Sequence, residues 1–352
     1  MDLKERNQWI IDAVVRKAER DCPEALAMVG IYGSFQTGDV HEKSDLDLLI
    51  LINDDRGWQL GSTFIQEDLA VGHDLYCTTW RDLERDAAHP HANISKLMNA
   101  KIVWHRSADD LARLEALREE ARANLEKPDT FEAAEEQLRM AEQDLGRAMI
   151  EEDMDALRAL AGDGLFRVEC ALALLNGRHF RYGTRRVFEE LGEMEHRPVG
   201  LRQMAEALAS AASPEELRQA LTALVRETVR VFDQVQKGRS EPKQPVSPDN
   251  LRGTYEEMFS NWRNKMYFAA ERGDLPLAFA TMTSFAGMVD EIRRETDVVC
   301  GSPWSGFDPG DLEASARNFD AFLEGYLENY RKAGLSPRRY RDIDAFLENY
   351  LK

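Results

Sequence analysis

Cysteine is scarce in this sequence, and no long apolar run occurs in it. The four cysteines are widely separated without metal-ligand spacing, which argues against a cysteine-based metal site; they are Cys22, Cys77, Cys170 and Cys300. A reducing, cytoplasmic location fits this cysteine usage. No apolar stretch approaches the ~18 residues that span a bilayer, and the first residues lack the apolar segment of a signal peptide. We therefore expect a soluble cytoplasmic protein without membrane contact.

Positive charge is also in deficit. The 352 residues include 45 Lys and Arg against 64 Asp and Glu, a formal net charge of −19. Because binding to a phosphate backbone requires clustered Lys and Arg, we do not expect a polynucleotide partner. The charge would suit a small cationic substrate, but acidity by itself also keeps a protein soluble, and we favour that plainer explanation. The length allows two or three domains.

The stretch from Ile31 to Asn53 carries the most informative pattern: an apolar strand, a Gly-Ser turn, a polar loop and a second apolar strand. Asp45 and Asp47 stand at the start of the second strand. Residues two apart on a strand face the same side, so both carboxylates are expected to point into one space. Two such carboxylates repel each other unless a cation lies between them, and Mg²⁺ prefers carboxylate and phosphate oxygens.

The turn before this loop is suited to phosphate. Gly33 lets the backbone approach a ligand closely, and Ser34 can offer a hydroxyl and an N–H if a helix begins there. Asp-x-Asp recurs at residues 153–155 and 342–344, but in helical patterns, where residues two apart do not share a face. Only the first pair follows a Gly-Ser turn and leads into an apolar strand.

This arrangement, Gly33-Ser34, ten residues ending in Ser44, then Asp45-Leu-Asp47, resembles the signature of the DNA polymerase beta-like nucleotidyltransferase superfamily. It is most similar to small-molecule nucleotidyltransferases, including aminoglycoside adenylyltransferases, and to minimal nucleotidyltransferases. The superfamily pattern includes a third carboxylate on a later strand, and Asp74 in the run from Gly72 to Cys77 supplies it.

The resemblance implies two Mg²⁺ ions held by Asp45, Asp47 and Asp74, with Asp74 also accepting the acceptor's proton. Gly33, Ser34 and Ser44 would hold the β- and γ-phosphates of a nucleoside triphosphate. The implied reaction moves a nucleoside monophosphate to a hydroxyl group, and ATP is the implied donor by resemblance only.

Three functional interpretations stay open at this point, and the first two differ in the acceptor. The first is a small hydroxylated molecule, such as an aminoglycoside-like compound. The second is a protein, as for antitoxin-type nucleotidyltransferases. The third interpretation is a non-catalytic nucleotide-sensing module, against which the complete carboxylate trio counts.

The hydrophobic periodicity predicts an α+β protein, with a small mixed-sheet nucleotidyltransferase domain followed by helical bundles. Residues 1–108 form the predicted catalytic domain, with strands expected at 27–32, 45–52, 72–80 and 101–105; residues 64–69 suggest a helix or half-buried loop. Residues 109–236 form a helical bundle expected to close one side of the cleft. Residues 237–250 are a polar linker with three prolines, and residues 251–352 are a further helical region.

Other polar residues have plainer explanations. A cationic loop could meet the triphosphate or could simply be solvated; its members are Arg178, His179, Arg181, Arg185 and Arg186. His73 should face away from Asp74 and is expected to be structural. His89 and His91 lack a third zinc ligand at suitable spacing. The repeat of Asp-Ala-Phe-Leu-Glu at 320–324 and 344–348 is best explained as a coincidence between amphipathic helices.

Overall fold

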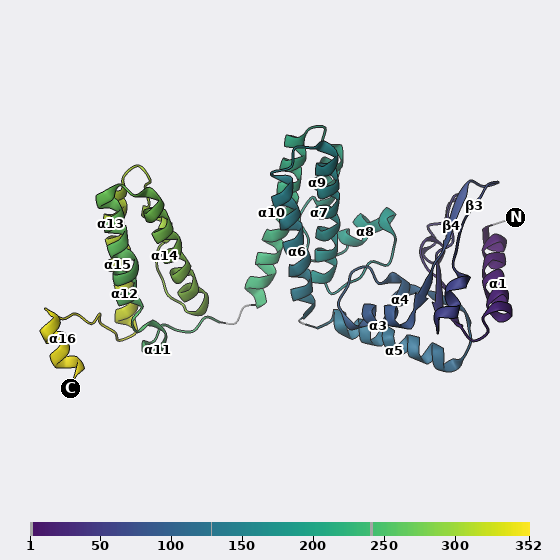
Figure 1. Ribbon diagram of the computed structural model, residues 1–352, viewed down its shortest axis with the longest axis horizontal. Coiled ribbons are helices and arrows are strands. Elements are labelled where there is room, and N and C mark those ends of the chain that lie inside the picture. Colours follow the sequence, from purple (N-terminus) through teal and green to yellow (C-terminus); the bar gives the residue numbers. More distant parts are fainter. Residues whose placement is uncertain (1–2, 128, 240–241) are drawn as a thin grey trace. The chain divides into compact units, whose positions relative to one another are not determined.

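The computed structural model describes residues 3–127, 129–239 and 242–352. The chain divides into two compact units, residues 1–239 and 240–352 (Figure 1). Each unit has its own hydrophobic core, so we describe them separately. The predicted α+β class is confirmed.

A four-stranded mixed sheet forms the centre of the first unit. Its strand order is β5-β2-β1-β6, where β1 pairs antiparallel with β2 and β6, and β2 pairs parallel with β5. The strands are β1 (Leu26–Ile31), β2 (Leu48–Ile52), β5 (Cys77–Thr79) and β6 (Lys101–His105).

Both faces of this sheet are covered, as the uninterrupted apolar sequence of β2 predicts. Leu48, Ile50 and Ile52 belong to a cluster with the apolar side of α1 (Leu3–Asp21). Leu49 and Leu51 belong to the opposite cluster, which also contains residues of the three helices around β6 in sequence. These are α3 (Trp80–Ala88), α4 (Ser95–Asn99) and α5 (Ala108–Leu125).

Two strands lie outside the main sheet. β3 (Ser62–Gln66) and β4 (Val71–Leu75) form a separate antiparallel pair. This corrects the prediction of a helix or half-buried loop around Phe64. The strand β3 is largely exposed on both sides, so its sequence lacks the alternation of apolar and polar residues that marks a half-buried strand. It also corrects the single strand predicted at 72–80, because the chain leaves one sheet at Leu75 and joins the other at Cys77.

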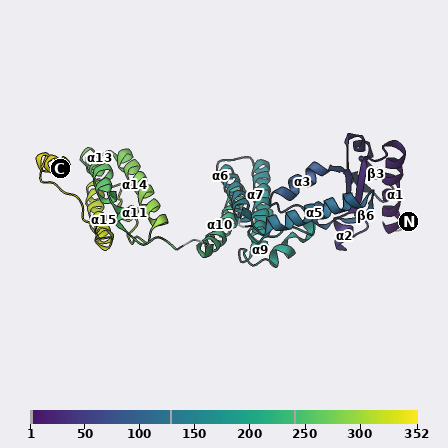
Figure 2. The ribbon, with the colours of Figure 1, turned by 90° about the horizontal axis from the view of Figure 1, so that it is seen from below.

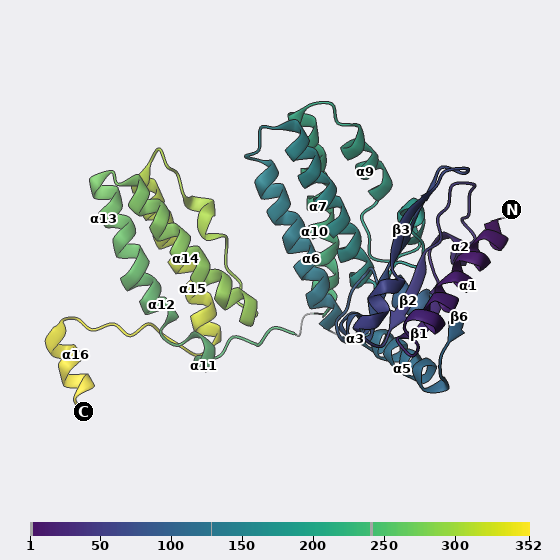
Figure 3. The same cartoon turned by 45° about the vertical axis from the view of Figure 1, so that its right-hand side comes forward.

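Helices make up the rest of the first unit. Helix α5 runs from beside β6 to the bundle (Figure 2). Helices α6, α7 and α10 pack side by side, with α9 against α10 (Figure 3). Short elements complete the unit, namely α2 (Ser34–Thr37), η1 (Asp55–Leu60), η2 (Thr184–Arg186) and α8 (Val187–Gly192). The long bundle helices are α6 (Asp129–Ala148), α7 (Met154–Leu175), α9 (Leu201–Ser210) and α10 (Pro214–Arg239).

One apolar cluster connects the sheet to this bundle. It includes Met28 and Leu49 from the strands, Leu114 from α5, and Leu172 and Leu224 from α7 and α10. The predicted boundary at residues 108 and 109 therefore crosses a shared core and stays a prediction. Helix α10 continues three residues past the predicted end at 236, and residues 240 and 241 of the predicted linker lie outside the described residues.

The regular secondary structure in the described part of the second unit is helical, apart from one isolated bridge between Gln244 and Thr296. Phe285 is fully buried at its centre, with ring contacts to Trp262, Phe319 and Phe322. The helical region predicted at 251–352 consists of several helices of different lengths. The elements are α11 (Pro248–Leu251), α12 (Thr254–Glu257), η3 (Met258–Arg263), α13 (Asn264–Arg272), α14 (Leu275–Glu295), η4 (Pro303–Gly306), α15 (Leu312–Lys332) and α16 (Ile343–Tyr350). No helix in the described ranges of either unit is long and apolar enough to cross a membrane.

The separate cores predict separate unfolding. Phe285→Ala should destabilise the second unit by about 3–5 kcal/mol, because it removes a fully buried ring and leaves a cavity. Calorimetry of the full chain should show one shifted transition and one unchanged transition. Leu49→Ala, in the sheet, is the matched control and should shift the other transition. A shift of both transitions by either variant would contradict two independent cores.

Candidate active site

The carboxylate pair lies where β2 begins. The amide of Tyr32 donates to the carbonyl of Asp47 at 3.1 Å, which extends the β1–β2 pairing one residue beyond the strand. Burial alternates along this segment: Ser44 and Leu46 are buried, Asp45 is exposed and Asp47 is half-buried. The alternation is that of an extended chain, so the two carboxylates lie on the same side, as the spacing predicts.

The electrostatics of this pair are unfavourable without a cation. Burial, and then the neighbouring Asp45 carboxylate, raise the pKa of Asp47 to about 6. Lys96 and the backbone amide of Ser34, which donates to the Asp47 carboxylate, act in the opposite direction. A half-buried carboxylate beside another carboxylate is a favourable site for a hard divalent ion.

Gly33 is required at the turn for two reasons. Its φ of +66° lies in a region that side chains rarely adopt, and a Cβ there would come within 1.9 Å of Asp47 Oδ2. The following residue, Ser34, begins α2, and its amide points at the Asp47 carboxylate rather than into solvent. The turn and the carboxylate pair are therefore in direct contact.

Asp74 approaches from the second sheet. It is exposed on β4, where it pairs with Thr63 of β3. Burial, then Asp47, Asp45 and Asp74, raise the pKa of Tyr32 to about 12, so all three predicted carboxylates act on one hydroxyl. Within the described part of the chain, however, no three Asp, Glu, His or Cys side chains are close enough to hold a metal ion. Asp45 and Asp47 form a pair, with Asp74 nearby.

Ser44 is set apart from the other predicted ligands. Only 4% of its surface is exposed, and its hydroxyl accepts a hydrogen bond from the His41 amide at 3.0 Å. It thus closes the loop in front of Asp45. Its predicted contact with phosphate stays a prediction, as do the roles assigned to Gly33 and Ser34.

Lys96 is the residue that sequence reasoning missed. It comes from the short helix α4, and its Nζ donates to Thr78 Oγ1 at 3.3 Å. The ammonium lies 5.7 Å from the ring centres of both Tyr32 and Tyr76, and it lowers the pKa of Asp47. No local pattern marks this lysine, because its position depends on how α4 packs against the sheet.

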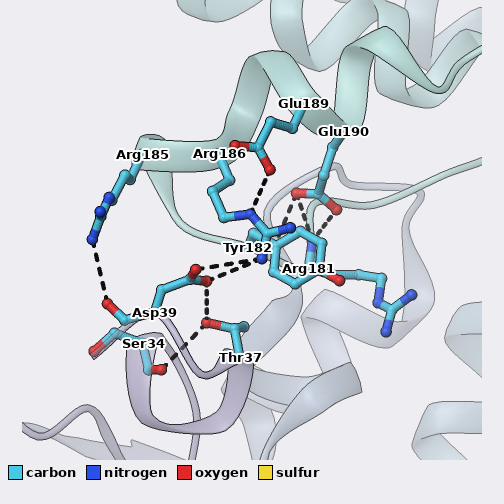
Figure 4. Close-up of polar contacts among 9 residues, drawn as sticks. All are labelled: Ser34, Thr37, Asp39, Arg181, Tyr182, Arg185, Arg186, Glu189 and Glu190. Atoms are coloured by element: carbon cyan, nitrogen blue, oxygen red, sulfur yellow. Dashed lines mark hydrogen bonds and ion pairs between the residues drawn. The ribbon is translucent and has the colours of Figure 1, made fainter. Parts of the chain in front are cut away.

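The cationic loop of the bundle contacts the turn through Asp39 (Figure 4). Arg186 Nη1 lies 3.3 Å from Asp39 Oδ2, and Arg185 donates to the Asp39 carbonyl at 3.5 Å. Thr37 Oγ1 donates to Asp39 Oδ2 at 2.7 Å and to the Ser34 carbonyl at 3.3 Å. The two arginines therefore hold Asp39, at the end of the turn that begins at Gly33, against the bundle.

Arg186 is held on several sides. Its Nε donates to Glu189 at 2.6 Å, and its guanidinium lies 3.9 Å from the ring centre of Tyr182 (Figure 4). Its charge is thus compensated within the protein. The predicted contact of this loop with triphosphate stays a prediction.

The remaining loop residues line a separate cavity of about 480 Å³ with α5 and α8. His179 is among them, and burial lowers its pKa to about 4, so it is neutral. Its Nε2 lies 3.0 Å from Asn99 Oδ1. The other two predicted cations of the loop, Arg178 and Arg181, also border this cavity.

Part of the chain is similar to a known protein family. Residues 9–104 match the family model of the nucleotidyltransferase domain. A search of curated proteins gives no match. Among solved structures, a nucleotidyltransferase-like protein from Exiguobacterium sibiricum 255-15 is similar, with 13% identity, a TM-score of 0.32, and coverage of 76% of this chain and 92% of that chain.

Residues 9–104 are therefore a nucleotidyltransferase domain of the DNA polymerase beta-like superfamily. The superfamily predicted from the Gly-Ser turn and the Asp-x-Asp pair is confirmed. The domain match ends just before α5, so the helices beyond it have no family assignment.

Two glycines of the turn allow a matched test. Gly33→Ala should displace Asp47 and weaken divalent-cation binding, because its Cβ would collide with the carboxylate. Gly38 also has a positive φ, +82°, but no atom lies within 4 Å of its Cβ position. Gly38→Ala should therefore cost only backbone strain, about 1 kcal/mol.

Calorimetric titration of each variant with Mg²⁺, together with thermal unfolding, separates the two effects. Equal cation affinity in both variants would show that contact between Gly33 and Asp47 is unimportant for binding.

The raised pKa of Asp47 predicts a pH-dependent stability. Its ordinary value is 3.8 and its folded value about 6, so the folded state binds more protons between these values. Protonated Asp47 therefore adds to the free energy of unfolding below pH ~4, and this stabilisation is lost as the pH rises through 6. In metal-free buffer, Asp47→Asn should exceed the wild type in melting temperature by about 2–4 °C at pH 8 and match it near pH 4. A difference independent of pH would contradict the assignment.

Proposed function

We propose that this protein is a Mg²⁺-dependent adenylyltransferase that transfers AMP from ATP to a hydroxyl group of a small molecule. The observation that carries the proposal is the Asp45–Asp47 pair in contact with the Gly33 turn, inside a nucleotidyltransferase domain. The two carboxylates, which repel each other, would bind a cation. The adjacent glycine turn would let a phosphate approach the backbone beside it.

The donor set fits Mg²⁺, since it consists of hard oxygen ligands on one side of an extended segment. Asp45 and Asp47 would hold the ions. Asp74 lies nearby without forming a three-ligand group with them in this structure, and it would complete the ligands of the ion next to the acceptor on closer approach. When bound, the ions would stabilise the negative charge that develops around the α-phosphorus during in-line displacement. Cation binding would also relieve the repulsion that raises the pKa of Asp47.

The protein's own groups then have definite roles. The Ser34 hydroxyl and the backbone at Gly33 would face phosphate oxygens, while the Ser34 amide holds the Asp47 carboxylate and Lys96 adds positive charge beside it. Asp74 would accept the proton of the acceptor hydroxyl as its oxygen attacks the α-phosphorus. The bond from that phosphorus to the bridging oxygen breaks, and pyrophosphate leaves.

A small hydroxylated amine is the proposed acceptor class, and an aminoglycoside-like compound is the first to test. The carboxylates around Tyr32 favour a cationic molecule near the site. A protein acceptor is the alternative candidate. It is favoured by the second unit, which has its own core and could serve as a docking module.

Pyrophosphate release tests the proposal. We expect ATP- and Mg²⁺-dependent release with a hydroxylated amine and none without an acceptor. Asp45→Asn and Asp47→Asn should each lower the rate at least about 100-fold, since each removes a metal ligand worth several kcal/mol in the transition state. Asp344→Asn is the matched control, because it alters another Asp-x-Asp pair far along the chain and should leave the rate unchanged.

The outcome also separates the alternatives. Release that requires an added protein and labels it with AMP would favour the protein acceptor. Normal turnover in either Asp45→Asn or Asp47→Asn would contradict the assignment of the carboxylate pair.

A further inference from the structure

A buried guanidinium lies behind the loop that carries Asp45. Arg6 is in the first turns of α1, and only 4% of its surface is exposed. Its Nη2 donates to the Ser44 carbonyl at 2.8 Å, and its Nε and Nη2 both donate to Asn7 Oδ1 at 3.1 Å. Both acceptors are neutral, whereas a buried charge is costly unless an opposite charge compensates it.

Two nitrogens at this place are buried without a hydrogen-bond partner: Arg6 Nη1 and His73 Nδ1. His73 is 2% exposed, and its ring is fixed by stacking on Phe64 at 4.8 Å and by a 3.3 Å contact between Nε2 and Gln66 Oε1. Native proteins rarely leave such groups unpaired, so each indicates a role.

Electrostatic effects connect these groups with Asp45. Burial is the larger influence and lowers the pKa of Arg6, while Asp45 raises it. Burial, then Arg6, lower the pKa of His73, and Asp45 again acts in the opposite direction. Arg6 and His73 thus form a buried polar region beneath the exposed Asp45. Asp47, in contrast, is influenced by Lys96 and the Ser34 amide.

We propose that Arg6 is a positioning residue for Asp45: it fixes the Ser44 carbonyl, and its buried charge holds the Asp45 carboxylate in place for a divalent cation. The proposal rests on the proposed function only in taking Asp45 as a metal ligand. A purely structural clamp would need the Ser44 hydrogen bond but no coupling to the Asp45 charge. The two possibilities therefore differ in what happens when that charge is removed.

The first experiment compares Asp45→Asn with Asp47→Asn in metal-free buffer containing a chelator at pH 8. The two substitutions remove the same charge two residues apart. Asp47→Asn should raise the melting temperature because it relieves repulsion, whereas Asp45→Asn should lower it by about 2–4 °C because it leaves Arg6 uncompensated. A rise of similar size in both variants would overturn the proposal.

The second experiment measures Mn²⁺ affinity from the loss of the free-ion paramagnetic resonance signal. Arg6→Gln should weaken binding about tenfold, as expected when a group that orients a metal ligand is removed. Arg6→Lys keeps the charge and should restore most of the affinity. Arg16→Gln, an exposed substitution on the same helix, is the control and should change nothing.

Unchanged Mn²⁺ affinity in folded Arg6→Gln would overturn the proposal. If Arg6→Gln does not fold, the Asp45 and Asp47 comparison and the Arg6→Lys affinity decide the question. Failure of the proposed function gives a different result, because wild-type protein would then bind no Mn²⁺ or transfer no AMP. The metal-free comparison would still report whether Arg6 and Asp45 are coupled.

Discussion

Repulsion between two carboxylates at the start of one strand is the constraint around which the first unit is arranged. Asp45 and Asp47 cannot separate, because the extension of the β1–β2 pairing fixes the backbone between them. The surrounding groups partly compensate the negative charge of the two carboxylates with positive charge or N–H donors. Lys96 and the Ser34 amide do so for Asp47, and Arg6 does so for Asp45. A protein that needed only stability would replace one of the two acids.

The parts of the site that depend on local backbone geometry could be predicted from sequence. The spacing of Asp45 and Asp47 requires only that the segment be extended, and the burial pattern agrees. Glycine at position 33 was expected for close approach to a ligand, and the structure adds a reason that was not predicted, namely the contact of this turn with the Asp47 side chain. These features depend on neighbours within the same twenty residues.

The parts that depend on packing between distant segments could not be predicted. Lys96 reaches Asp47 only because α4 packs against the sheet, and Arg6 reaches Ser44 across 38 positions of sequence. The break between β4 and β5 at Tyr76 was missed because Tyr76 and the two threonines after it are typical strand residues, so the segment looks continuous and only the partner strands distinguish its two parts. Asp74 was recognised by residue type, but how near it lies to the pair depends on the small second sheet.

The core shared by the sheet and the bundle has a consequence for how substrates enter. Met28 and Leu49 pack in one apolar cluster with residues of α7 and α10, so swinging the bundle away as a rigid lid would expose that cluster to water. The cost would rise with every apolar side chain uncovered. Access to the carboxylates does not require such a movement, because Asp45 is already exposed. The ion pair of Asp39 with Arg186 ties the turn after Gly33 to the bundle as well. The first unit therefore presents its carboxylates from an assembled structure, and not from two parts that open and close around a substrate.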